Sequence, residues 1–209
     1  MDCDILTDVH ETWFPKQCAY YEDCLEAHMR YSSHWFKWKL RRACKRVKFA
    51  AVEANLGRRT VCRCHRDYKN LAYGLCMLIV LGAFDHERGG QLVLHELKLV
   101  IDLKPGDVLF LPSALITHQN LPIGEDETRF SITGYTAGGL FQLYDHFVLS
   151  QVEIRREIAR EKEDMEWGEG TEGYLEHLEL LLSTPEGGQA TWNNGWELFS
   201  TMKELRAFY

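Results

Sequence analysis

Apolar positions in the first part of the chain recur at every third or fourth residue. From Ser33 to Asn55 these positions are Phe36, Leu40, Cys44, Val47, Ala51 and Ala54. This period is that of an amphipathic helix, with Ser33 as its N-cap and Gly57 as its stop. The pattern predicts a basic helix over residues 33–55, preceded by a shorter helix after Pro15.

From Arg59 to about Leu143 the period shortens to two. Turn residues separate six β-rich stretches: TVCRCHRD, YGLCMLIVLGAF, GGQLVLHELKLVIDL, GDVLFLPS, ITHQNLPI and TRFSITGYTA. No helical repeat interrupts them, which favours a sandwich or barrel. Among such folds the jelly roll is the commonest that also holds a metal at its mouth, so we expect a jelly roll.

After Ser150 the chain becomes acidic and its apolar spacing helical again. Ser150 and Glu153 form a capping-box pattern before QVEIRREIAREKEDMEW, and two further amphipathic stretches follow, EGYLEHLELLL and GWELFSTMKELRAFY. The prediction is a single α+β domain over 1–209. Its parts are an N-terminal helical part (1–58), a jelly-roll core (59–145) and a C-terminal helical part (146–209).

Composition supports one well-buried domain, since the chain has 209 residues of which 45% are hydrophobic. The longest apolar run, residues 74–84, is too short to span a bilayer, and the acidic start MDCDILTDVHETW lacks the features of a signal peptide. Seven cysteines without a regular framework favour reduced thiols. We expect a monomer without membrane contact, in a reducing compartment such as the nucleus.

Charge is segregated along the chain, although the formal net charge is only −7. Residues 30–69 hold 13 Lys and Arg against two acids, while the remainder holds 11 against 29. This segregation indicates an electropositive face for nucleic acid, with a solvated basic helix as the alternative. The candidate phosphate contacts on the helix are Arg41, Arg42, Lys45 and Arg46.

His65 and Asp67 stand two positions apart in RCHRDYKN, so an extended backbone would direct both side chains to one metal ion. His118, in LPSALITHQN, is the candidate third ligand. Two histidines and one carboxylate leave coordination positions open, which is typical of non-haem Fe(II) oxygenases rather than closed zinc sites. Two alternatives remain: His118 as an ordinary core histidine, and a zinc site built from Cys62, Cys64, His65 and Cys76.

Arg129 follows His118 by 11 positions and has Ser131 two residues beyond it in TRFS. An arginine on an inward-facing strand needs a buried anion, because an unpaired buried guanidinium is very costly. The distal carboxylate of 2-oxoglutarate would supply one.

Three stretches together, HRDYKN, GGQLVLHELKLVIDLKPGDVLFLPSALITHQN and ETRFSITGYTAGGLF, resemble the TET/J-binding-protein class of dioxygenases. The resemblance covers residues 61–143 and is strongest to the fungal, transposon-associated members. It implies a double-stranded β-helix and the cofactors Fe(II) and 2-oxoglutarate, with O₂ as co-substrate. It also implies His65, Asp67 and His118 as metal ligands, and Arg129 with Ser131 as the holders of the 2-oxoglutarate C5 carboxylate.

By the same resemblance the substrate is methylated DNA, with 5-methylcytosine oxidised to its hydroxymethyl and further forms, and Asn70 contacts the flipped base. Two departures are the absence of a cysteine-rich DNA-binding region and Ala137 where a second histidine is expected near the base. The alternatives are an N6-methyladenine or other N-methyl nucleobase demethylase, a protein hydroxylase, and a non-catalytic nucleic-acid-binding module. RNA is the alternative nucleic acid, and Asn70 as a simple turn residue is the alternative for that position.

Overall fold

The computed structural model describes residues 9–35, 42, 47–145, 151–166, 172, 175, 179 and 195–208. Its helices are α2 (Pro15–Trp35), α3 (Gly138–Asp145), α4 (Gln151–Glu166) and α7 (Met202–Phe208). Its strands are β1 (Ala51–Asn55), β2 (Cys76–Ala83), β3 (Leu92–Leu94), β4 (Leu99–Ile101), β5 (Val108–Leu111), β6 (His118–Asn120) and β7 (Thr128–Tyr135).

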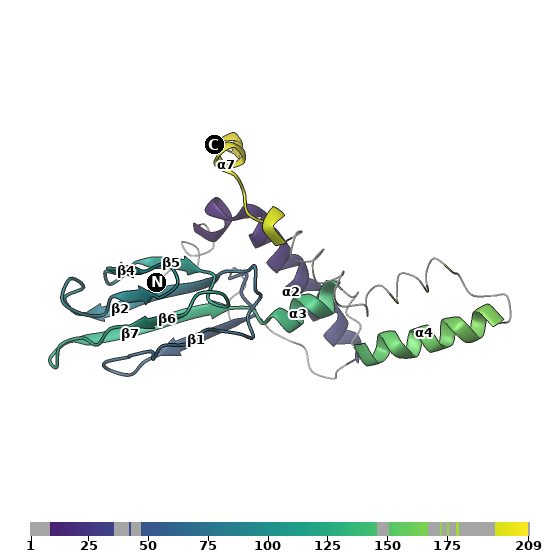
Figure 1. The fold of residues 1–209 in the computed structure, drawn as a ribbon, viewed down its shortest axis with the longest axis horizontal. Coiled ribbons are helices and arrows are strands. Elements are labelled where there is room, and N and C mark those ends of the chain that lie inside the picture. The colour runs from purple at the N-terminus through teal and green to yellow at the C-terminus, as the bar shows by residue number, and fades with distance from the viewer. Residues whose placement is uncertain are drawn as a thin grey trace.

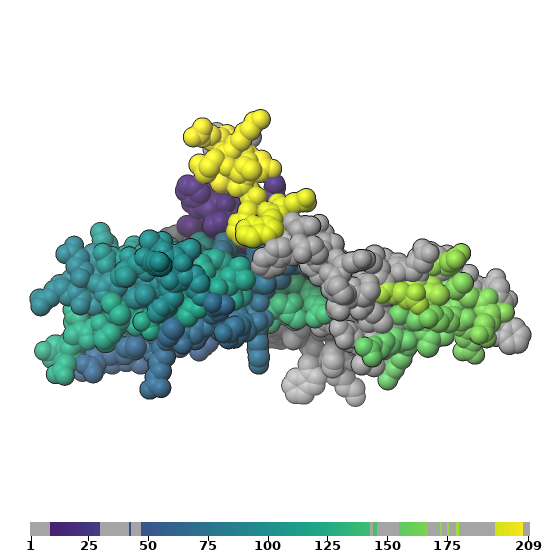
Figure 2. All heavy atoms as spheres, viewed as in Figure 1, coloured from purple at the N-terminus to yellow at the C-terminus, as the bar shows by residue number. Residues whose placement is uncertain are grey.

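The strands form two sheets, one of four strands in the order β1-β7-β2-β5 and one of three in the order β4-β3-β6. Every pairing between these strands is antiparallel. In Figure 1 α2 and α3 lie at one end of the sheets, and α4 extends away from them. In Figure 2 α4 likewise protrudes from the part of the molecule that the strands form. The chain thus has a mixed helix and antiparallel-sheet architecture, as the α+β prediction required.

Strand β2 explains why the stretch CMLIVLGA is almost continuously apolar. Met77 and Ile79 pack in a core with residues of α2, whereas Cys76 and Val80 pack in a second core with β3. Because successive side chains of a strand point to opposite faces, a strand covered on both faces needs apolar residues at nearly every position. The four-stranded sheet is therefore an inner layer, between α2 on one side and the smaller sheet on the other.

Helix α2 is tied to the start of β2 through one tyrosine. The Tyr21 hydroxyl accepts a hydrogen bond from the Leu75 amide at 3.0 Å and donates one to the Leu75 carbonyl at 3.2 Å. Tyr21 is 1% exposed. This contact satisfies backbone groups that precede the strand and fixes the helix against the sheet.

The predicted basic helix over 33–55 is wrong at its start and in its second half. Ser33, its predicted N-cap, lies inside α2, which continues to Trp35. Residues 47–49 have no regular structure, and Ala51–Asn55 form strand β1, which pairs with β7 from Ala51↔Tyr135 to Asn55↔Ser131. Val47 and Phe49, two positions apart, are both buried. The sheet edge of β7 supplies hydrogen bonds and packing that override the local helical spacing.

Two further predictions are corrected by the structure. The stretch TVCRCHRD is an irregular segment with one isolated bridge, at His65, rather than a strand. In GWELFSTMKELRAFY, α7 starts only after Thr201, whose hydroxyl accepts from the Glu204 amide at 3.2 Å while the Glu204 carboxylate accepts from the Thr201 amide at 2.7 Å. This capping box starts a new helix inside a stretch that the apolar spacing predicted to be one continuous helix.

The predicted helix after Ser150 is present as α4, while most of the predicted helix EGYLEHLELLL lies outside the described residues. Among the described helices, none is both long and apolar enough to cross a membrane. The division into three parts of a single domain stays a prediction.

Candidate metal centre

Residues 58–70, named here the wall segment, are hydrogen-bonded to one strand of each sheet, β7 and β6. At the start of this segment the Arg129 amide donates to the Arg58 carbonyl at 2.9 Å, and the Thr60 amide donates to the Arg129 carbonyl at 3.1 Å. Further along, the Cys62 amide donates to the Asn120 side chain at 2.7 Å. The segment is held by β7 and then by β6, although it is not itself a strand.

His65 and His118 form a single antiparallel bridge where the wall segment meets β6. The His65 amide donates to the His118 carbonyl at 3.1 Å, and the His118 amide donates to the His65 carbonyl at 2.9 Å. Directly opposed residues of this kind present their side chains to the same face. The two imidazole rings accordingly have centroids 4.4 Å apart.

Each imidazole is oriented by a backbone carbonyl two residues before it. His65 Nδ1 lies 2.6 Å from the Arg63 carbonyl, and His118 Nδ1 lies 2.8 Å from the Ile116 carbonyl. A carbonyl oxygen only accepts, so both Nδ1 atoms carry a proton, and Nε2 is the ring nitrogen that each histidine presents to the cluster. This is the arrangement that metal-binding histidines adopt.

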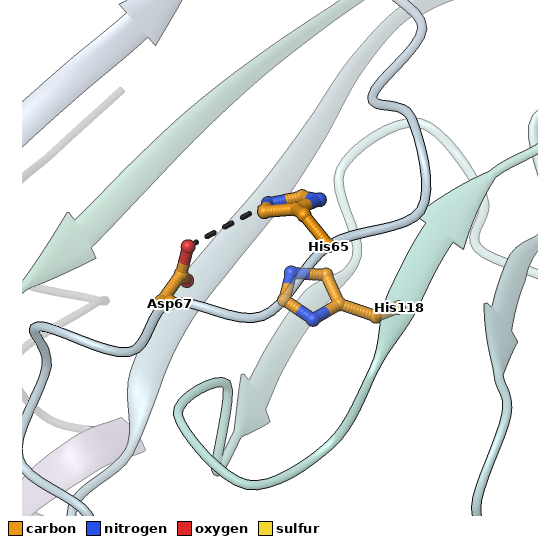
Figure 3. Close-up of side chains that lie close together, drawn as sticks. All are labelled: His65, Asp67 and His118. Atoms are coloured by element: carbon orange, nitrogen blue, oxygen red, sulfur yellow. Dashed lines mark ion pairs between the residues drawn. The ribbon is translucent and has the colours of Figure 1, made fainter.

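Asp67 completes the cluster shown in Figure 3, where its carboxylate points toward His65. Its Oδ1 lies 3.5 Å from His65 Nε2. On the other side, Asn70 Nδ2 lies 3.4 Å from Asp67 Oδ2 and 3.2 Å from Ser113 Oγ. The Asp67 amide also donates to the Ser113 carbonyl at 3.0 Å. The carboxylate is therefore oriented by its own neighbours, with one oxygen left toward the histidines.

The candidate ligand atoms of His65, Asp67 and His118 all lie within 4.8 Å of one another. Burial lowers the pKa of His118, and neighbouring His65 adds to this effect, so His118 is neutral at physiological pH. A neutral imidazole is the form that binds metal. Two nitrogen donors and one carboxylate from one side fit Fe(II) with open positions.

The alternative zinc site is not assembled among the described residues, where the one cluster of three or more metal-ligating side chains is His65, Asp67 and His118. Cys64 Sγ instead lies 3.5 Å from His95 Nε2. Cys76 is buried in the core between the sheets, and burial raises the pKa of its thiol to about 11, which disfavours the thiolate that zinc requires.

The cluster opens into a cavity of about 550 Å³ between the two sheets. Alternate residues of β7, from Arg129 and Ser131 to Thr133 and Tyr135, line it. Because alternate residues of a strand share one face, this one strand presents a row of four side chains to the cavity, beginning with the Arg129 guanidinium. The apolar part of the lining comes from Leu78, Leu92 and Leu111.

Arg129 is 2% exposed and has no acidic partner among the described residues. Its Nη1 donates to the Thr60 carbonyl at 3.4 Å, while its Nε has no hydrogen-bond partner among the described residues. Burial lowers its pKa, although the group stays protonated at neutral pH. A cavity-lining guanidinium in this state is a strong binding site for a carboxylate.

Several polar residues of the cavity were missed by the sequence prediction. Asn55 Nδ2 donates to Ser131 Oγ at 3.3 Å, but Asn55 fell within the predicted helix. Asn120, two residues after His118, bonds the wall segment through the Cys62 amide and the Thr60 carbonyl. Its position in the period-two stretch ITHQNLPI, on the same face as His118, was the signal that could have identified it.

A clamp also joins the two ligand-bearing segments. Thr117, next to His118, donates from its amide to Glu96 Oε2 at 2.7 Å and from its hydroxyl to Glu96 Oε1 at 2.6 Å. Arg66, between His65 and Asp67, donates to Thr117 Oγ1 at 2.7 Å and forms an ion pair with Glu96. The hydrogen bonds from Thr117 and Arg66 lower the pKa of Glu96 to about 2.

The predicted phosphate contacts are only partly described. Arg41, Lys45 and Arg46 lie outside the described residues. Arg42 lies within them and forms an ion pair with Glu22 of α2 at 3.1 Å. Its guanidinium thus has an acidic partner within the chain rather than the free exposure that the helix prediction assumed.

No family model and no curated protein matches the chain. Among solved structures 15 chains match. One is NgTET1 in complex with 5mC DNA, 26% identical, with a TM-score of 0.33, covering 37% of this chain and 28% of that one. Another is the viral collagen prolyl hydroxylase vCPH from Paramecium Bursaria Chlorella virus-1 in a 2OG complex, 19% identical, with a TM-score of 0.30, covering 40% of this chain and 56% of that one. The matched part is less than two thirds of either neighbour.

Proposed function

We propose that this chain is a 2-oxoglutarate and Fe(II)-dependent dioxygenase built on a jelly-roll core. The cluster of His65, Asp67 and His118, with ligand atoms within 4.8 Å, is the observation that carries the proposal. Both imidazoles have Nδ1 directed to a backbone carbonyl, which leaves Nε2 as the nitrogen that each ring would offer to the metal. The two facing antiparallel sheets support the jelly-roll assignment.

Arg129 supports 2-oxoglutarate as the cosubstrate. Its guanidinium is buried, lines the same cavity as the three ligands and has no carboxylate partner among the described residues. Ser131 is on the same face of β7 and is held by Asn55. We assign Arg129 and Ser131 to the C5 carboxylate, which would satisfy the orphaned guanidinium nitrogen.

When bound, iron and 2-oxoglutarate supply the oxygen chemistry that hydroxylates an unactivated methyl group. The chain's own residues bind and orient. Asn70 and Ser113 fix the Asp67 carboxylate, the bridge between His65 and His118 fixes both rings, and Arg129 fixes the cosubstrate. The leucine lining excludes water from the space between the sheets.

The substrate that we propose is a methylated base of DNA, with 5-methylcytosine first. Such a base must be extruded from the duplex to enter a cavity of this kind. Asn70 lines the cavity and uses Nδ2 for Asp67 and Ser113, which leaves Oδ1 as an acceptor. An acceptor suits the exocyclic amino group of cytosine. Because five cysteines of the described residues are free thiols, we also propose a reducing compartment, the nucleus.

Mass spectrometry of nucleosides tests this function. Purified protein with Fe(II), 2-oxoglutarate and O₂ is incubated with DNA that contains 5-methylcytosine, with DNA that contains N6-methyladenine, with methylated RNA and with a peptide library. We expect 5-hydroxymethylcytosine to form in the same molar amount as succinate. Neither product should form with the His118→Ala variant. If only one of the other substrates were oxidised, the dioxygenase class would stand and the proposed substrate would be wrong. Absence of succinate with every substrate would overturn the enzyme class.

A further inference from the structure

The wall segment carries a row of cations without partners. Arg58, Arg59, Arg63 and Lys69 are all exposed, and their side chains make no hydrogen bond or ion pair with any residue that the structure describes. Asp67 is the one acidic residue between positions 58 and 70, and its carboxylate faces the candidate metal centre. The four exposed charges of this segment are therefore all positive, and the side chain of its one carboxylate, Asp67, is 34% exposed on the side of the candidate metal centre.

An exposed aromatic ring lies on the same segment. Tyr68 is 80% exposed and also lines the cavity, so it stands at the cavity mouth beside Asp67. Leu56, just before the segment, is 73% exposed, and Val61 within it is 47% exposed. These three large side chains are exposed on or next to the same segment that carries the unpaired cations.

Cations for a phosphate backbone combined with an aromatic ring for bases form the usual surface for a single strand of nucleic acid. The wall segment bonds to Arg129 of β7 near its start and to His118 of β6 further along. His65, Asp67 and Tyr68 of the segment line the cavity together with Arg129. A strand bound along this segment would therefore pass the cavity mouth where a base has to enter.

We propose that the wall segment is the DNA-binding surface of this protein, with Arg58, Arg59 and Arg63 against phosphates and Tyr68 stacked on a base at the cavity mouth. This inference rests on the proposed function, because it takes the cavity as the site of base oxidation. It moves the DNA contacts from the predicted basic helix to a segment that directly borders the metal centre.

Salt-dependent binding tests the cationic part. The variant R58Q/R59Q/R63Q and the control variant R88Q/K98Q/K104Q remove three exposed cations each, the control from loops between β2 and β5. Fluorescence anisotropy with an oligonucleotide that contains 5-methylcytosine is recorded at several NaCl concentrations without iron or 2-oxoglutarate. We expect the slope of log K against log salt to fall by roughly two to three units in the first variant only, because each phosphate contact contributes about 0.7 to 0.9. An unchanged slope in R58Q/R59Q/R63Q, or an equal fall in the control variant, would overturn the proposal that the wall segment binds DNA.

Tyr68 is tested by a pair of substitutions. Tyr68→Ala should weaken binding to single-stranded DNA on the order of tenfold or more, whereas Tyr68→Phe, which keeps the ring, should bind as the wild type does. Equal affinities of the two variants would exclude stacking. Polyglutamate serves as the competing probe: if it displaces DNA at matched charge concentration, an acidic protein is the partner and DNA is not.

These measurements separate the surface from the chemistry. DNA binding is measured without the cofactors, so it does not depend on turnover. Succinate formation by the wild-type protein without DNA reports on the metal centre alone. A protein that forms succinate but binds no DNA would overturn the inference and leave the dioxygenase class in place.

Discussion

His65 and His118 exchange both of their backbone hydrogen bonds across one isolated antiparallel bridge, and this pairing places their rings 4.4 Å apart. The two residues are far apart in the chain, yet their relative position is set by main-chain atoms rather than by side-chain packing. A candidate metal site built in this way would be preorganised, because its side chains are in place before an ion arrives.

Removal of any one of the three proposed ligands should strongly weaken metal binding. We expect His65→Ala, Asp67→Ala and His118→Ala each to lower Fe(II) affinity on the order of a hundredfold or more, because three ligands already leave coordination positions open. Fe(II) affinity is measured by anaerobic titration of the protein with Fe(II) in the presence of 2-oxoglutarate, and the visible charge-transfer band is the signal. His95→Ala is the control, since His95 is exposed and outside the cluster. A ligand variant that retained the band would contradict the assignment of that residue.

Arg129→Leu should remove cosubstrate binding without weakening the fold. The wild-type guanidinium is buried without an acidic partner, so its loss should leave the thermal midpoint of the protein without 2-oxoglutarate no lower than that of the wild type. Added 2-oxoglutarate with Mn²⁺ should stabilise the wild type and not the variant. Thermal unfolding with and without the cosubstrate tests both parts. A cosubstrate-dependent shift that persisted in Arg129→Leu would place the C5 carboxylate elsewhere.

Glu96 should position the two ligand segments. Glu96→Gln breaks the ion pair with Arg66 and weakens the bonds from Thr117, and we expect metal affinity to fall about tenfold to a hundredfold. Glu127→Gln is a matched control, because Glu127 also accepts bonds from two backbone amides, those of Asp85 and Gly124, outside the cluster. Calorimetric titration with Mn²⁺ compares the variants. Equal affinities in the two would show that the clamp is only a surface contact.

The same clamp predicts a pH dependence. The pKa of Glu96 is lowered from 4.5 to about 2 in the folded protein. The ionised Glu96 carboxylate therefore contributes to stability above pH 4.5, and this contribution is lost as the pH falls toward 2. The difference in stability between wild type and Glu96→Gln should therefore be constant at neutral pH and shrink in acid. Urea unfolding at several pH values measures it, and a difference that grew in acid would contradict the assignment.

Asn70 has two roles to separate, and Ser113 provides the comparison. Both Asn70→Ala and Ser113→Ala disturb the bonds that hold Asp67, so both should lower metal affinity. Only Asn70→Ala removes the Oδ1 acceptor in the cavity, so it should lower the kcat for 5-methylcytosine further at saturating metal. Turnover at saturating Fe(II) distinguishes them, and equal kcat values would leave Asn70 as a positioning residue alone.

The α+β class and most strand positions follow from the sequence because period-two spacing between turn residues is a local property. The stretch TRFSITGYTA became β7, and GDVLFLPS became β5. By contrast, residues 51–55 had apolar spacing compatible with a helix, and their pairing with β7 decided that they form β1. A sequence pattern contains no information about which sheet edge is available.

The sequence by itself determined which residue types face the cavity: alternate residues of β7 share one face, so Arg129 and Ser131 had to point the same way. Only the tertiary structure decided that His65, in an irregular segment, lies opposite His118 and that Arg129 has no acidic partner among the described residues. The physical reason is that side-chain direction along a strand is fixed by local backbone geometry, whereas contacts between distant segments depend on main-chain hydrogen bonds that form only when the chain is folded.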